Sequence, residues 1–151
     1  MNISILYATL TGYSESVAMD LSGILKDMGW EVTMTDVTQL AKPHAPLEGN
    51  IIFGCSTYGD GDLNDIAEEF IESLRSAKLD LSHANMAIFA LGESIYPDFC
   101  GAGQLAKEAF ESLNAQVIEP IMSIDTLELD QEKKKQDLLS WATHITTAFD
   151  V

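Results

Sequence analysis

The pattern that most constrains this chain is the alternation of short apolar runs with stretches of helical periodicity. Runs rich in branched and aromatic side chains lie at 3–8, 32–34, 51–55, 86–91 and 117–124, the lengths of strands. The intervening stretches place apolar residues three or four positions apart, as amphipathic helices do. Nearly continuous apolar strands followed by helices predict a parallel sheet covered on both faces. We therefore expect an α/β protein with a doubly wound, five-stranded parallel sheet.

Length and composition predict a single domain spanning 1–151. The 151 residues match the size of one average domain, and 46% hydrophobic with 21% charged residues excludes a disordered or low-complexity chain. No apolar run approaches the roughly 18 residues of a membrane span. The first 14 residues also lack the Lys or Arg that opens a signal peptide. We expect a cytoplasmic protein without a membrane partner.

The charge is strongly acidic. Eight Lys and Arg against 24 Asp and Glu give a net charge of −16, which disfavours nucleic acid and anionic lipid and favours a basic protein partner. The run Lys133 to Lys135 at the start of the last helix is predicted to be a solvated face. Cys55 and Cys100 are too few for a disulfide scaffold and have no zinc-ligand spacing, so both are expected to be reduced thiols.

Three loops follow the first, third and fourth predicted strands, whose carboxyl ends border the usual ligand crevice of such a sheet. The first loop, 9–14, supplies three hydroxyls and Gly12 directly before a helix. It is interpreted either as a phosphate site without cations or as ordinary helix capping. The second loop carries Tyr58 between polar residues and glycines, and the third carries Tyr96. Each tyrosine could lie flat on a planar ligand.

These three loops together resemble the flavodoxin family, and the resemblance covers essentially the whole chain. The stretch 9–14 is similar to the family's T-x-T-G-x-T phosphate loop, 56–60 to its S-T-W-G-D loop, and 91–101 to its G-D-S-x-Y-x-x-F-C-G loop. The departures are Ser14 for Thr, Tyr58 for Trp and Glu93 for Asp. Because the stretch between Val117 and the last helix is short, the chain resembles a short-chain flavodoxin. A tyrosine at position 58 also resembles the flavodoxin-like modules of diflavin reductases.

The resemblance implies a flavodoxin-like strand order of 2-1-3-4-5 and a tightly bound, non-covalent FMN. The loop 9–14 would hold the phosphate, Tyr58 and Tyr96 would sandwich the ring, and the peptide Gly59-Asp60 would reorient on reduction. It implies no catalytic residue and no metal ligand. The residues it assigns to the cofactor are Thr9, Leu10, Thr11, Gly12, Tyr13, Ser14, Ser56, Thr57, Tyr58, Gly59, Asp60, Leu91, Gly92, Glu93, Tyr96, Phe99 and Cys100.

The implied function is that of a monomeric carrier of single low-potential electrons between an NAD(P)H-dependent reductase and acceptor enzymes. Six carboxylates and no basic residue lie between Thr57 and Leu74. A carboxylate about 10 Å from the flavin disfavours its anionic reduced form by roughly 1.7 kcal/mol, or about 70 mV, at an effective dielectric of about 20. An FMN-dependent NAD(P)H reductase is the alternative. A phosphorylation receiver is disfavoured because Cys55 stands where it needs an aspartate.

Overall fold

The computed structural model describes residues 1–40, 47–58 and 61–150. Its sheet contains four longer parallel strands, which lie in the order β2 (Glu31–Asp36), β1 (Asn2–Ala8), β3 (Gly49–Tyr58) and β5 (Ala84–Gly92). Two short strands, β6 (Gln116–Val117) and β7 (Met122–Asp125), both pair in parallel with β5. The predicted doubly wound sheet and its strand order are confirmed, with β6 and β7 together in the fifth place.

The prediction of one continuous fifth strand over 117–124 is wrong in detail, because the strand is interrupted between β6 and β7. Pro120 lies in the interruption and has no N–H to donate to a ladder. Its carbonyl instead accepts a hydrogen bond from the indole N–H of Trp141 at 2.9 Å, and His144 Nε2 lies 2.6 Å from the carbonyl oxygen of Glu119. Side chains of the last helix therefore bind the backbone carbonyls that the sheet leaves unpaired.

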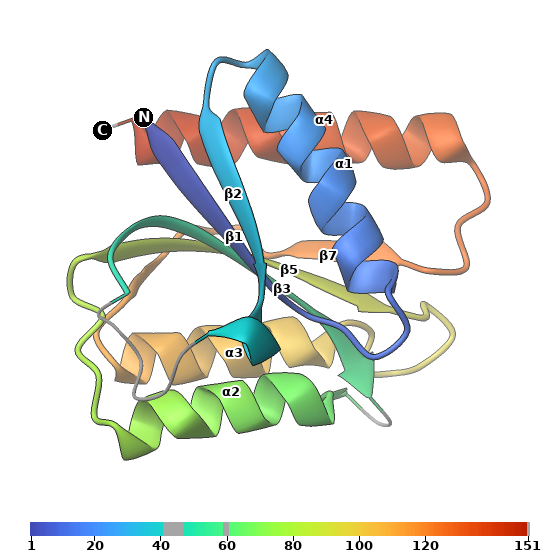
Figure 1. Cartoon of the computed structure of the whole chain (residues 1–151). Coiled ribbons are helices and arrows are strands. Elements are labelled where there is room, and N and C mark those ends of the chain that lie inside the picture. The colour runs from blue at the N-terminus through green and yellow to red at the C-terminus, as the bar shows by residue number, and fades with distance from the viewer. Residues whose placement is uncertain (41–46, 59–60, 151) are drawn as a thin grey trace.

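Helices cover both faces of the sheet (Figure 1). Helices α1 (Tyr13–Asp27) and α4 (Gln131–Phe149) pack on one face around Leu21, Phe89 and Trp141. Helices α2 (Asp65–Ser76) and α3 (Gly101–Ser112) pack on the other, where Phe53 lies between Phe70 and Phe110. A short 3-10 helix, Val37–Gln39, follows β2. Within the described residues, no helix combines the length and apolarity needed to cross a membrane.

The ends of the helices follow the local sequence signals. Gly29, just beyond α1, has a left-handed φ of +94°, the conformation in which a glycine commonly ends a helix. Asn64 caps α2 by accepting a hydrogen bond from the backbone N–H of Ala67 at 2.8 Å. Along the sheet, Ala8 pairs with Cys55 and Ser56 pairs with Leu91. This register brings the loops after β1, β3 and β5 to one edge, on either side of the point where strand order reverses.

Candidate functional site

The first loop presents the start of α1 to this edge without a side-chain cap. Gly12 adopts a left-handed φ of +88°, and its N–H donates to Thr9 Oγ1 at 2.8 Å. The helix begins at Tyr13, and no side chain caps it by accepting a hydrogen bond from its first backbone N–H groups. The first N–H groups of a helix have no partner inside the helix and carry its positive dipole end. The loop thus offers an anion a set of backbone donors.

Two buried hydroxyls at this edge have no hydrogen-bond partner. Ser14, in the first turn of α1, is 1% exposed, and Thr57 lies at the end of β3. In the part of the chain that the structure describes, Ser14 Oγ and Thr57 Oγ1 are the buried side-chain oxygen or nitrogen atoms that lack a partner. A buried unpaired hydroxyl lowers the stability of the folded protein by about 1–3 kcal/mol. Such a hydroxyl therefore indicates a position where a ligand or partner can accept its hydrogen bond. Both belong to the predicted cofactor loops.

Asn64 ties the first two loops together, a role that sequence reasoning missed. Its side-chain N–H groups donate to the carbonyl of Ala8 at 3.1 Å and to the hydroxyl of Ser56 at 2.9 Å. Its carbonyl accepts from Ala67, so one fully buried amide joins the ends of β1 and β3 to the start of α2. In the sequence, an asparagine directly before a helical stretch indicates only a helix cap. The hydrogen bonds to Ala8 and Ser56 span 56 and 8 positions of the chain, so no local sequence pattern predicts them.

The third loop is anchored by Cys100. This residue has a left-handed φ of 56°, and its thiol donates to the carbonyl of Ala90 at 3.3 Å. A side chain on Gly92 would meet Cys100, with a Cβ only 3.0 Å from its backbone nitrogen. Burial raises the pKa of Cys100 to about 11 and that of Cys55 to about 12. Both thiols are therefore protonated at neutral pH, in agreement with their expected inert character.

The second and third loops touch through glycines. Gly61 has a φ of +101°, and a Cβ there would lie 2.6 Å from the Cβ of Asp98. A Cβ on Gly101 would lie 2.8 Å from the carbonyl oxygen of Gly61. This close approach brings the loops that carry Tyr58 and Tyr96 together, and the two tyrosines are 61% and 50% exposed.

The predicted residues divide by exposure. Leu10, Thr11 and Tyr13 of the first loop are exposed, and Thr9 is half-buried. Leu91 and Cys100 are buried, so only their backbone groups are available at the edge, whereas Glu93 and Phe99 are half-buried. Ser56 is half-buried and bonded to Asn64. The predictions for Gly59 and Asp60 lie outside the described residues.

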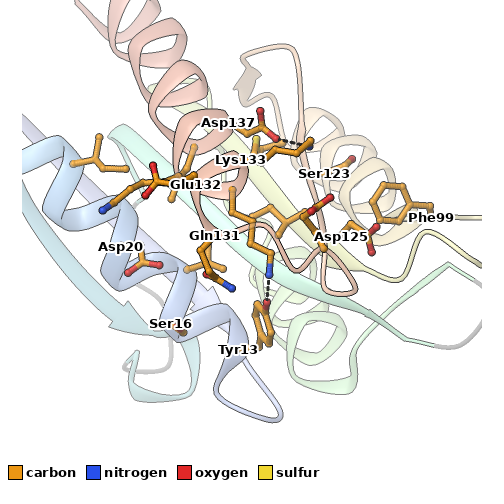
Figure 2. A pocket seen from close by; sticks show the side chains of 18 residues that line it. Tyr13, Ser16, Asp20, Phe99, Ser123, Asp125, Gln131, Glu132, Lys133 and Asp137 are labelled. Carbon is orange, nitrogen blue, oxygen red and sulfur yellow. Dashed lines mark hydrogen bonds and ion pairs between the residues drawn. The ribbon is translucent and has the colours of Figure 1, made fainter.

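A cavity of about 540 Å³ lies next to the first loop, between α1, β7 and α4. Tyr13 and Phe99 from the predicted site line it, together with Asp125 and the lysines at the start of α4 (Figure 2). Figure 2 shows Tyr13 at the foot of α1 with its hydroxyl directed toward α4. The cavity borders the first and third loops but is mostly formed by the two helices, which sequence reasoning did not connect with the site.

The fold and this edge define a doubly wound α/β protein with an anion-binding helix start and exposed aromatic rings at the strand-order reversal. This is the architecture of a nucleotide-cofactor protein. A model of the flavodoxin family matches residues 5–141. The chain belongs to the flavodoxin family, whose members are FMN-binding electron-transfer proteins, and the expected family and cofactor are thereby confirmed.

Individual relatives place the chain within this family. It is 30% identical to a flavodoxin of Nitratidesulfovibrio vulgaris, over 97% of this chain and 98% of that protein. It is 32% identical to NADPH oxidoreductase A of Dictyostelium discoideum, over 86% of this chain but only 20% of that protein. A Fusobacterium nucleatum flavodoxin bound to flavin mononucleotide superposes with a TM-score of 0.77 at 18% identity, over 98% of both chains, and so shares the fold.

Proposed function

We propose that this chain binds FMN at the three loops and carries single electrons at low potential between an NAD(P)H-dependent reductase and acceptor enzymes. The observation that carries the proposal is the buried, unpartnered hydroxyl of Ser14 in the uncapped first turn of α1. A phosphate is the ligand that accepts hydrogen bonds from such a hydroxyl and from helix N–H groups without needing a cation at the loop.

The roles of the individual residues follow from their positions. The 9–14 loop, with Ser14 and the first N–H groups of α1, would hold the phosphate, while Ser56 and Thr57 would face the ribityl and phosphate side. Tyr58 and Tyr96 expose large rings that can cover both sides of a flavin. Backbone groups of residues 91–93 and of Phe99 and Cys100 would meet its polar edge. The role of the Gly59-Asp60 peptide stays a prediction.

FMN supplies the redox chemistry when bound, and the chain supplies the surrounding charge. The described carboxylates of the second loop and α2 are exposed: Asp62, Asp65, Glu68, Glu69 and Glu72. Negative charge near the ring disfavours additional negative charge on it. The carboxylates would therefore lower the potential at which the last electron is taken up, as a donor of low-potential electrons requires.

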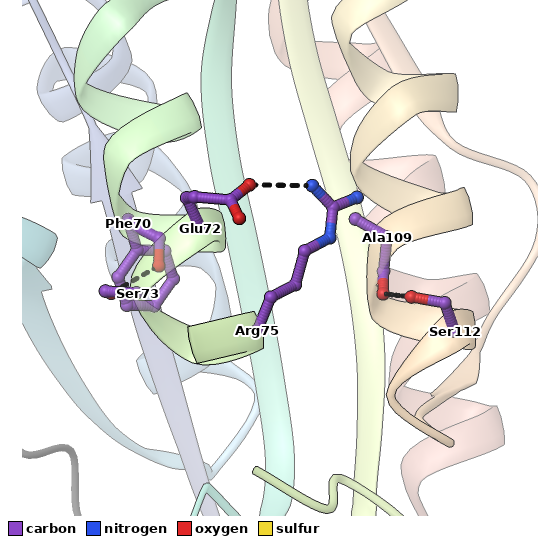
Figure 3. Close-up of polar contacts among 6 residues, drawn as sticks. All are labelled: Phe70, Glu72, Ser73, Arg75, Ala109 and Ser112. Carbon is purple, nitrogen blue, oxygen red and sulfur yellow. Dashed lines mark hydrogen bonds and ion pairs between the residues drawn. The ribbon is translucent and has the colours of Figure 1, made fainter. Parts of the chain in front are cut away.

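A groove of about 570 Å³ between α2 and α3 extends this acidic surface from Tyr58. Asp62, Asp65, Glu68 and Glu108 line it. At its other end Arg75 pairs with Glu72 at 3.2 Å, and Figure 3 shows the guanidinium between the two helices. The acidic end of the groove adjoins the proposed flavin site, so a redox partner with a basic patch would be steered toward the flavin.

The first experiment is uptake of flavin by the purified protein. We expect a yellow protein whose bound flavin has quenched fluorescence, and an apoprotein that prefers FMN to riboflavin. An apoprotein that takes up neither flavin would contradict the proposal. Partner exchange tests the acidic surface separately: its rate should fall as ionic strength rises, and a rate independent of salt would exclude electrostatic docking.

The alternative, direct oxidation of NAD(P)H by this chain, is suggested by the match to part of NADPH oxidoreductase A. Anaerobic mixing of the FMN-loaded protein with NADPH alone separates the two functions. We expect no bleaching of the flavin without an added reductase. Rapid bleaching by NADPH alone would favour the reductase.

A further inference from the structure

One lysine at the start of α4 does not lie on the solvated face predicted for it. Lys133 and Lys135 are exposed, and Lys133 pairs with Asp137 at 2.9 Å. Lys134 is half-buried. It stands four residues before the buried Leu138, so it occupies the first position of the stripe that α4 turns inward. All three lysines line the cavity between α4 and α1, and Lys134 is the one whose side chain is partly withdrawn from solvent.

The ammonium group of Lys134 contacts the first loop. Its Nζ donates to the hydroxyl of Tyr13 at 3.2 Å, a hydrogen bond drawn in Figure 2. The distance from Nζ to the centre of the Tyr13 ring is 6.0 Å. The ammonium thus lies beyond the hydroxyl, close to the ring plane, and the contact is a hydrogen bond rather than a cation over the ring face. Tyr13 directly precedes Ser14, which links this charge to the uncapped helix start.

Asp125 is one of the acidic residues that line this cavity, and its carboxylate interacts with the charge of Lys134. Its carboxylate accepts hydrogen bonds from the backbone N–H groups of Ser94 at 3.2 Å and Leu127 at 3.0 Å. The hydrogen bonds from Ser94 and Leu127 lower the pKa of Asp125, and the charge of Lys134 adds to this effect. Asp125 keeps its negative charge at neutral pH, so Lys134 balances a carboxylate that lines the same cavity as Tyr13.

We propose that Lys134 is a positioning residue for the FMN phosphate and makes the site select FMN over riboflavin. The inference rests on the proposed function, and it adds a cation from the last helix to a phosphate loop that contains none. Lys134 acts in two ways: it holds Tyr13 at the start of α1, and it offsets Asp125. The phosphate of FMN carries close to two negative charges at neutral pH. Without Lys134, the uncovered charge of Asp125 would repel it.

The test compares apoprotein variants in fluorescence titrations with FMN and with riboflavin. For Lys134→Gln we expect the Kd for FMN to rise roughly tenfold and the Kd for riboflavin to change by less than about twofold. Lys135→Gln is the matched control because it makes the same change in net charge on the next, exposed residue. It should raise the Kd for FMN by less than about threefold. Asp125→Asn should have the opposite sign and tighten FMN binding.

The outcomes separate the proposal from its alternatives. Equal losses for FMN and riboflavin in Lys134→Gln would show that the lysine only maintains the loop, and would overturn the proposal. An equal loss in Lys135→Gln would assign the effect to net charge and would overturn it as well. A parent protein that binds riboflavin as tightly as FMN refutes the inference but leaves flavin binding standing. A parent that binds neither flavin overturns the proposed function itself.

Discussion

Replacing Ser14 by Ala should stabilise the apoprotein and weaken FMN binding at the same time. The side chain is 1% exposed and its hydroxyl has no partner in the protein. In the apoprotein, removing this hydroxyl removes the cost of an unpaired buried group. In the FMN complex, by our proposal, the same hydroxyl donates to the phosphate. One substitution therefore acts with opposite signs on the free and the loaded protein.

The expected sizes follow from the burial and from the charge of the acceptor. An unsatisfied buried hydroxyl costs about 1–3 kcal/mol, and alanine has the higher helix propensity by less than about 0.7 kcal/mol. A small cavity offsets part of this gain, so we expect the apoprotein to gain about 1 kcal/mol. A hydrogen bond to a charged group contributes about 1.5–3 kcal/mol, which corresponds to a loss of roughly ten- to hundredfold in FMN affinity.

The assays are urea unfolding of the apoprotein and fluorescence titration with FMN and riboflavin. Ser16→Ala is the matched control, because Ser16 lies on the same turn of α1 but is exposed. It changes helix propensity in the same way without touching a buried hydroxyl. It should leave FMN affinity within about twofold and stability within about 0.5 kcal/mol of the parent. Riboflavin affinity should be unchanged in both variants.

The reasoning would be refuted by an apoprotein that Ser14→Ala destabilises while FMN affinity stays unchanged. That result would mean that the hydroxyl has a protein partner in solution and that the phosphate lies elsewhere. A loss of riboflavin affinity equal to the loss for FMN would also count against it, since the effect would then not involve the phosphate.

The remaining predictions concern the second and third loops. Asn64→Ala should lower the free energy of unfolding by about 2–4 kcal/mol in urea titrations, because it removes the α2 cap and two contacts that join the strand ends. Asn64→Asp keeps the cap acceptor but turns a buried carboxylate oxygen toward the carbonyl of Ala8, so it should not restore the lost stability. Tyr96→Ala should weaken FMN binding and raise the fluorescence of the bound flavin, and unchanged affinity would remove Tyr96 from the ring stack. The pKa values of Cys55 and Cys100 are raised from 9.0 to about 12 and about 11. The folded state therefore holds protons that unfolded thiols release near pH 9, and stability should decline as pH rises above 9. This decline should be smaller in Cys100→Ala, as measured by unfolding at pH 8 and pH 10.

Much of the fold could be predicted because its signals are local. The alternation of apolar runs and helical stripes follows from backbone geometry and burial, which act within one element. Gly29 and Asn64 mark helix ends through their own conformational and hydrogen-bonding preferences, and the structure places them there. The three loops meet at one edge because parallel strands that are neighbours end on the same side.

The details that complete the site depend on contacts between residues far apart in the chain. Asn64 reaches Ala8 across 56 positions, and Lys134 reaches Tyr13 across 121. The run of three lysines predicts a solvated face by composition, yet the rotation of α4 against the sheet turns its middle member inward. In the break between β6 and β7, the carbonyl of Pro120 likewise accepts its hydrogen bond from Trp141, 21 positions away.

The sequence by itself determined the order of strands and helices, the acidic charge and the three loops that meet at one edge of the sheet. Only the tertiary structure decided that the hydroxyls of Ser14 and Thr57 are buried without partners and that a lysine of the last helix lies beside the first loop. The reason is physical: periodicity and capping are properties of consecutive residues. Burial and pairing depend on the register of the sheet and on how the helices rotate as they pack.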